Sequence, residues 1–137
     1  MTTELTMLTL SAVMCLLLPN IAILALPGVP GGFAWGLGNR DTAAPGLPAW
    51  AERARRAHAN LAENLVVFAA LVLTAHVAGR TNSMTALGAQ LFFWGRVAHV
   101  ATYIGGLVPW RTVAFSVAIV GEWMIALQLL LLSLIHI

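Results

Sequence analysis

Four long apolar segments follow one another along the chain. The first, Leu5–Leu26, has no charged residue, and the other three have one each: Ala57–Ala78, Met84–Ile104 and Thr112–Ile135. About 20 apolar residues in a helix span the hydrocarbon core of a bilayer. The pattern therefore predicts an all-α membrane protein with a single domain over residues 1–137. We expect a four-transmembrane-helix bundle, with helices at about residues 5–26, 54–79, 84–105 and 111–135.

The segment between the first two predicted helices, residues 27–53, has a different composition. It holds four of the six prolines and six of the twelve glycines, and these residues disfavour a regular helix. We predict a long loop there, and short turns at residues 79–83 and 105–111. Glu4 is the only charged residue before the first apolar segment, whereas a signal peptide begins with basic residues. We therefore expect the first helix to be retained.

The composition excludes several classes of protein. Hydrophobic residues make up 60% of the chain and charged residues 9%, against about 25% charged residues in a soluble domain. This excludes an ordinary soluble globule, a disordered chain and a nucleic-acid-binding module. The single cysteine, Cys15, cannot form a disulfide within the chain, and the four histidines lack the spacing of a metal site. We expect no metal.

The basic residues, all of them arginine, are distributed unevenly between the loops. Arg40, Arg53, Arg55 and Arg56 lie in or next to the long loop, and Arg111 is the last residue of the turn at residues 105–111, whereas the turn at residues 79–83 holds only Arg80. Cytoplasmic loops carry the excess of arginine and lysine. This predicts that the long loop and the last turn are cytoplasmic and that both termini lie outside, in what we expect to be a bacterial inner membrane.

Polar residues recur at helical spacing inside the predicted spans. They are Arg56, Asn60 and Glu63 on the second helix, and Arg96, His99 and Tyr103 on the third. Spacings of three, four and seven residues place side chains on one helical face. A charged residue at the centre of a span costs roughly 2.5–3.5 kcal/mol on insertion scales, so such residues face protein or water. With Arg111, they predict a cationic cluster in the cytoplasmic half that fits a small ligand with several carboxylates.

A structural interpretation of the same residues stands beside the functional one. Glu63 and Arg96 could form an ion pair that joins two helices, and the arginines before the second helix could be ordinary interface anchors. Glu122 could carry protons or be a buried partner of Arg96, and we favour the partner. We favour an interhelical hydrogen bond for Asn20. Arg40 and Asp41 could cap the site or pair with each other.

Two sequence segments are similar to those of a known family. Residues 55–64, RRAHANLAEN, resemble the helix 2 signature of the membrane-associated proteins in eicosanoid and glutathione metabolism (the MAPEG family), and residues 95–103, GRVAHVATY, resemble its helix 3 signature. The resemblance covers roughly residues 38–130, and residues 38–41, GNRD, are similar to bacterial members. Neither segment alone is specific, but the two at this separation are.

This resemblance implies a left-handed four-helix bundle assembled as a homotrimer, with glutathione as co-substrate bound between subunits. By position in the motifs, the residues implied to bind glutathione are Arg56, Asn60, Glu63, Arg96, His99 and Tyr103. Arg111 resembles the catalytic arginine that stabilises the glutathione thiolate. Ala59 stands where the prostaglandin E synthase type has a second arginine, and His99 where the leukotriene C4 synthase type has a tyrosine, so no eicosanoid substrate is assigned.

We therefore predict a glutathione-dependent membrane transferase or peroxidase that acts on a lipophilic electrophile or hydroperoxide. The sequence does not choose between these two reactions. The alternative is a non-catalytic integral membrane protein of the same fold that binds lipid, another anionic ligand or a protein partner. A small transporter is disfavoured, because the sequence shows no pair of interrupted membrane helices.

Overall fold

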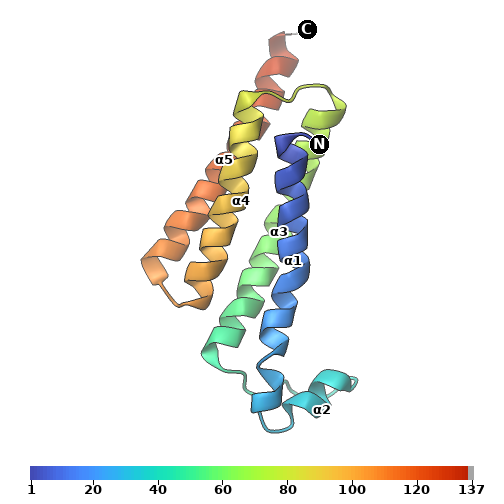
Figure 1. The fold of residues 1–137 in the computed structure, drawn as a ribbon, viewed down its shortest axis with the longest axis vertical. Helices are drawn as coiled ribbons and strands as arrows, with labels where there is room; N and C mark the ends of the chain where they lie inside the picture. Colours follow the sequence, from blue (N-terminus) through green and yellow to red (C-terminus); the bar gives the residue numbers. More distant parts are fainter. Residues whose placement is uncertain (136–137) are drawn as a thin grey trace.

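The computed structural model describes residues 1–135, and this part of the chain is helical apart from its turns and connections. Its elements are α1 (Thr3–Ile23), a 3-10 turn (Leu26–Gly28), α2 (Gly32–Leu37), α3 (Ala49–Val77), α4 (Ser83–Ile104) and α5 (Val108–Ile135). The four long helices alternate in direction, so that α2 and the α4–α5 turn lie toward one end of the bundle and both termini lie toward the other (Figure 1).

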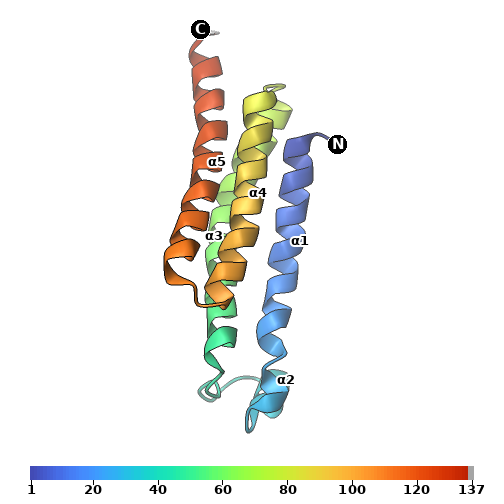
Figure 2. The ribbon, with the colours of Figure 1, turned by 60° about the vertical axis from the view of Figure 1, so that its left-hand side comes forward.

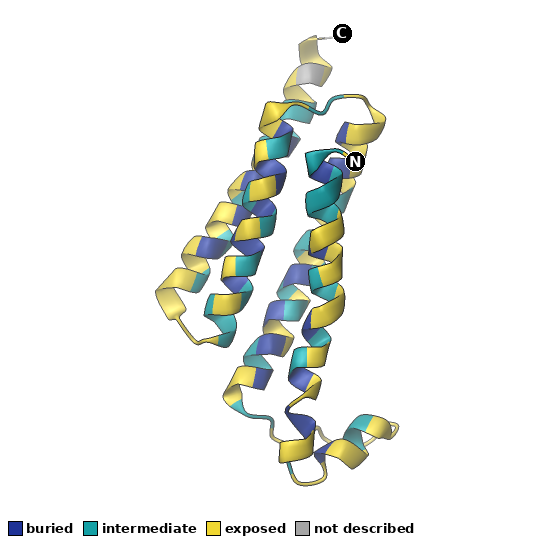
Figure 3. Ribbon diagram, viewed as in Figure 1, coloured by how far each residue is buried: buried dark blue, intermediate teal, exposed yellow. Residues whose placement is uncertain are grey.

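The long helices form two antiparallel pairs, α1 with α3 and α4 with α5 (Figure 2). Helix α3 contacts each of the other three long helices, and so does α4. Figure 3 shows that buried positions gather where the helices face one another. Large apolar side chains such as Leu16, Val66, Trp94 and Trp123 are exposed on the outer faces, as expected where a helix faces lipid.

Three helices, α1, α3 and α5, are long and apolar enough to cross a membrane. The sequence predicts a fourth membrane span at residues 84–104. Helix α4 does not reach the mean hydropathy of a membrane span, because Gln90, Arg96 and His99 lower it. It nevertheless has 22 residues, or about 33 Å of helix, and it packs against the other three long helices. Of the three polar residues, Arg96 and His99 are buried inside the bundle, whereas Gln90 is exposed.

Glycines bring the backbones of α4 and α5 into direct contact. A Cβ atom on Gly88 would lie 2.7 Å from the carbonyl oxygen of Gly121, and one on Gly95 would lie 2.8 Å from the amide nitrogen of Ala118. Small residues at membrane helix interfaces permit such close approach. Gly95 precedes Arg96 and Gly121 precedes Glu122, so this contact also fixes the positions of two buried ionisable residues.

The rest of the core is apolar, with polar contacts at the end that holds the termini. Phe68 of α3 stacks on Phe92 of α4, with ring centroids 3.8 Å apart and planes inclined by 14°. Near the N-terminus, the hydroxyl of Thr85 donates to the buried carboxylate of Glu4 at 2.5 Å. The side chain of Asn82 caps α4. The hydrogen bond between Thr85 and Glu4 joins α1 to the start of α4.

The four long helices begin earlier than the sequence indicated, by one or two residues for α1 and α4 and by more for α3 and α5, where a proline explains the difference. Helix α3 begins at Ala49, directly after Pro48, and α5 begins at Val108 with Pro109 in its first turn. The first amides of a helix have no intrahelical acceptor, so a proline is tolerated there. The segment 27–53 is consequently not one long loop: it contains α2 and the first turn of α3. Arg111 lies in the first turn of α5.

Candidate functional site

Arg96 is the most deeply buried charged residue in the bundle. Its exposed fraction is 0%, and its Nη2 atom donates to Oδ1 of Asn60 on α3 at 2.7 Å. Its guanidinium carbon lies 5.6 Å from the centroid of the Phe115 ring on α5. Residues from two other helices, α3 and α5, therefore contact this side chain, and the structure brings Asn60 and Arg96 into direct contact.

His99 lies one helical turn further along α4 and connects it to Arg111. Its side chain is buried, and its Nδ1 atom lies 2.9 Å from the backbone oxygen of Arg111. A carbonyl oxygen can only accept, so Nδ1 carries a proton in this hydrogen bond. The guanidinium carbon of Arg111 lies 4.9 Å from the centroid of the Tyr103 ring. Helix α4 thus holds both the backbone and the side chain of Arg111.

Four buried polar atoms at this site have no hydrogen-bond partner within residues 1–135. They are Nε and Nη1 of Arg96, Nε2 of His99 and Oε1 of Glu122. Glu122 lies on α5 and is 8% exposed. A buried polar group without a partner costs about 1–3 kcal/mol. The site is therefore suited to a polar ligand or to water.

The structure does not bring Arg56 and Glu63 into this cluster. In the single chain both side chains are exposed. The ion pair considered between Glu63 and Arg96 does not form, because Asn60 is the α3 residue that contacts the Arg96 guanidinium. Among the described residues, the only ion pair is the one between Glu52 and Arg55, at 3.3 Å.

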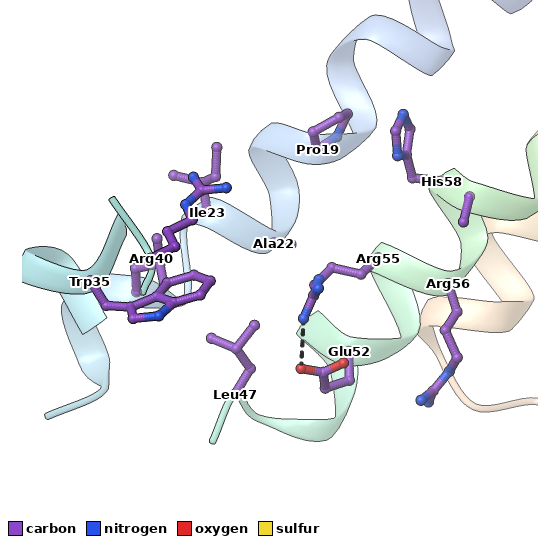
Figure 4. A pocket seen from close by; sticks show the side chains of 12 residues that line it. Pro19, Ala22, Ile23, Trp35, Arg40, Leu47, Glu52, Arg55, Arg56 and His58 are labelled. Atoms are coloured by element: carbon purple, nitrogen blue, oxygen red, sulfur yellow. Dashed lines mark hydrogen bonds and ion pairs between the residues drawn. The ribbon is translucent and has the colours of Figure 1, made fainter. Parts of the chain in front are cut away.

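A second polar region is a pocket of about 620 Å³ between α1, the α2 segment and α3 (Figure 4). It combines apolar residues of α1, such as Pro19 and Ile23, with basic side chains. The charged residues and the histidine that line it are Arg40, Glu52, Arg55, Arg56 and His58. Its polar side chains are mostly exposed or half-buried, unlike those around Arg96.

The structure also shows the contacts of Arg40 and Asn20, two residues for which the sequence left alternatives open. Arg40 lies over the ring of Trp35, at 5.1 Å from its centroid, and forms no ion pair with Asp41 in the described part of the chain. The amide of Asn20 donates to the carbonyl of Leu16 in its own helix and is exposed. Within a helix, this local bond to the residue four positions earlier is available to a short polar side chain.

Sequence reasoning treated Arg53 as a membrane anchor and missed its contact. Its Nε atom donates to the carbonyl oxygen of Ile104, the last residue of α4, at 2.9 Å. The last carbonyls of a helix lack intrahelical partners, and Gly106 (φ 74°) turns the chain next to the Arg53 side chain. The two glycines of this turn and the basic run at the start of α3 are the sequence signals that could have suggested this link between α3 and the end of α4.

No group of three or more histidine, cysteine, aspartate or glutamate side chains within residues 1–135 is arranged to hold a metal ion. Two of the four unpartnered atoms at the Arg96 cluster are guanidinium nitrogens, which are donors. Donors of this kind bind oxygen atoms of carboxylates or phosphates rather than a cation.

Comparison with known protein families matches residues 3–131, nearly the whole chain, to the MAPEG family. This confirms the resemblance seen in the two helix motifs. Members of the family include glutathione transferases and peroxidases as well as non-catalytic proteins. No curated protein matches the chain. The family and the three long apolar helices together indicate an integral membrane protein.

Proposed function

Because the chain belongs to the MAPEG family, we propose that it is a glutathione-dependent membrane transferase or peroxidase that acts on a lipophilic electrophile or hydroperoxide. The observation that carries the proposal is the buried guanidinium of Arg96, which has one nitrogen bonded to Asn60 and two nitrogens without a partner in residues 1–135. A desolvated guanidinium is a strong binder of carboxylates. Glutathione offers two carboxylates, an ammonium group and a thiol.

Each polar residue has a role in this proposal that follows from its chemistry. Arg96 and Arg56 bind the two carboxylates, because arginine pairs with a carboxylate through two parallel hydrogen bonds. Glu63 binds the ammonium group. Asn60 and Tyr103 orient the peptide by hydrogen bonds. His99 uses Nδ1 to hold Arg111, so its Nε2 atom is the one that remains for the ligand.

Arg111 is the proposed catalytic residue. A free thiol has a pKa of about 8.5, and a neighbouring guanidinium favours the thiolate. In conjugation, the thiolate sulfur forms a bond to the electrophilic carbon, the leaving group departs with its electron pair, and the thiol proton goes to water. In peroxide reduction, two glutathione thiols are oxidised to a disulfide while the hydroperoxide is reduced to an alcohol and water. Both reactions need the thiolate that Arg111 stabilises.

The exposure of Glu63 supports assembly with further copies of the chain. Glu63 lies near the middle of α3, about 21 Å from its first residue. A carboxylate at that depth is costly in lipid. We propose a homotrimer in which a neighbouring subunit covers this face, with the site open to the cytoplasm and the lipophilic substrate arriving from the bilayer. The arginines near the α2 end favour a cytoplasmic position for that end.

The first experiment is glutathione binding to the purified protein in detergent, followed by the thiolate absorbance at about 240 nm. We expect saturable binding with a thiolate signal at neutral pH. Arg111→Ala should lose the thiolate signal and the reaction rate while it retains much of the binding. Arg56→Ala should lose binding. Arg80→Ala, at the opposite end of the bundle, is the matched control and should change neither.

The second candidate is a non-catalytic member of the same family, which would use the cluster for a lipid headgroup, another anion or a protein partner. It predicts no thiol-dependent reaction with any electrophile or hydroperoxide. Saturable glutathione binding without a thiolate signal would favour it. Absence of any binding, in protein shown to be folded by its thermal transition, would refute the glutathione assignment.

A further inference from the structure

We propose that the pocket between α1, the α2 segment and α3 binds one anionic phospholipid of the bilayer, with the head-group phosphate at Arg40 and Arg55. The pocket has a volume of about 620 Å³, within the range of about 300–1,000 Å³ that is usual for small-molecule sites. Its lining residues come from α1, the α2 segment and the start of α3, whereas the Arg96 cluster lies between α3, α4 and α5. The proposal is therefore independent of the proposed function.

The charged side chains of the pocket leave a net positive charge. The guanidinium carbon of Arg40 lies 5.1 Å from the centroid of the Trp35 ring, and Arg40 forms no ion pair within residues 1–135. Arg55 is paired with Glu52 at 3.3 Å. Figure 4 shows the Arg55 side chain on the pocket side of α3, whereas Arg56 points away from it. Two guanidiniums beside one carboxylate favour an anionic ligand, and guanidinium matches phosphate oxygens in geometry.

The opposite wall of the pocket is apolar and continues onto the outer face of α1. Pro19 and Ile23 line the pocket (Figure 4). Leu16 precedes them at a spacing of three and seven residues, so the three side chains lie along one helical face. Leu16 is 74% exposed and Ile23 is 50% exposed. An acyl chain that leaves the pocket along this face therefore stays in contact with apolar side chains, which a small soluble anion does not require.

The α2 segment places the pocket at the surface of the bilayer. Phe33 and Leu37 are 64% and 76% exposed, and their spacing of four residues puts them on one face of α2. A short helix with such a face is stable in the interface between head groups and acyl chains, where tryptophans such as Trp35 are also enriched. The arginines at this end favour the cytoplasmic leaflet, which contains anionic lipids. A bilayer lipid is thus the occupant that fits both walls.

Quenching of tryptophan fluorescence by brominated lipid tests the proposal, because Trp35 lines the pocket. The full chain is reconstituted in phosphatidylcholine vesicles that contain increasing fractions of phosphatidylglycerol brominated on its acyl chains. We expect saturable quenching in excess of that by brominated phosphatidylcholine, and Trp35→Phe should remove this excess. Arg40→Gln and Arg55→Gln should each weaken the apparent affinity about fivefold. Arg80→Gln, at the opposite end of the bundle, is the matched control and should leave it unchanged.

Several outcomes would overturn the proposal. They are equal quenching by the two brominated phospholipids, excess quenching that both arginine variants retain, and an equal loss in Arg80→Gln, which would indicate general attraction to a charged surface. Loss of the excess quenching on addition of inorganic phosphate would assign the pocket to a soluble anion instead. A brominated fatty acid that quenches as strongly as phosphatidylglycerol would assign it to a carboxylate. If a glutamine variant does not fold, the lysine variant takes its place, with an expected loss of about twofold.

The experiment contains no glutathione, so its result does not depend on the proposed function. Binding of phosphatidylglycerol by a protein that fails to bind glutathione would leave the lipid site standing.

Discussion

Arginines occupy two regions of this bundle, and the surroundings of the two differ. Around Arg96 the helices touch through glycine backbones, and the polar atoms are buried, with several lacking partners. Around Arg55, between α1 and α3, the side chains are more accessible, and the Glu52–Arg55 pair has side chains that are 36% and 52% exposed. Water competes with a ligand for exposed charges, whereas a desolvated donor binds strongly. Of the two arginines, we therefore expect Arg96 to contribute more to the affinity for a ligand than Arg55 does.

The largest expected effect comes from the helix contact that builds the first region. Gly121→Ala introduces a Cβ that would meet the amide nitrogen of Phe92 at 2.7 Å, and a backbone cannot move aside as a flexible side chain can. We expect a loss of about 3 kcal/mol in the free energy of unfolding and, through the displaced Arg96, a loss of ligand binding. The measurement is thermal unfolding in detergent.

Gly46→Ala is the matched control, because a Cβ at Gly46 meets no atom within 4 Å. It should leave the transition temperature almost unchanged. If both substitutions had the same effect, close packing of α4 and α5 would not distinguish the two regions.

The second-largest expected effect is the difference in glutathione affinity between two variants, one with an arginine of each region replaced. Arg96→Gln removes the donor to Asn60 and the buried positive charge, and a hydrogen bond to a charged group contributes about 1.5–3 kcal/mol. We expect glutathione affinity to fall by about thirtyfold. Arg55→Gln removes an exposed guanidinium paired with Glu52 and should lower affinity less than about twofold. Isothermal titration of both variants checks this, and equal losses would contradict the comparison.

The two regions also differ in how far the sequence predicted them. The spacing of Arg96, His99 and Tyr103 placed them on one face of α4, because helical periodicity is a local property. The same spacing grouped Arg56, Asn60 and Glu63, yet only Asn60 contacts Arg96. A shared helical face covers a wide arc, and the rotation of each helix toward its neighbours is set by tertiary contacts.

Those contacts depend on residues that carry no chemical signal in the sequence. Gly88, Gly95 and Gly121 fix the α4–α5 interface, but a glycine in an apolar segment is common in membrane helices. Pro48 lies in the segment predicted to be a loop and Pro109 in a predicted turn, although each stands at a helix start, where proline is compatible. The four helices could be predicted from the sequence because each depends on composition over about 20 residues. The arrangement of the site could not, because it depends on contacts between individual residues.

The smallest predicted effect concerns the bond that connects the two regions. Arg53 lies at the start of α3, and its Nε atom holds the carbonyl of Ile104 just before the turn that leads to Arg111. Arg53→Lys keeps the positive charge but replaces a planar fork of donors with a single ammonium. We expect glutathione affinity to stay within about twofold and the reaction rate to fall about threefold, because Arg111 is less well positioned while Arg96 is untouched. Steady-state kinetics that separate kcat from KM check this. A fall in affinity with an unchanged rate would show instead that Arg53 supports the binding region and not the catalytic arginine.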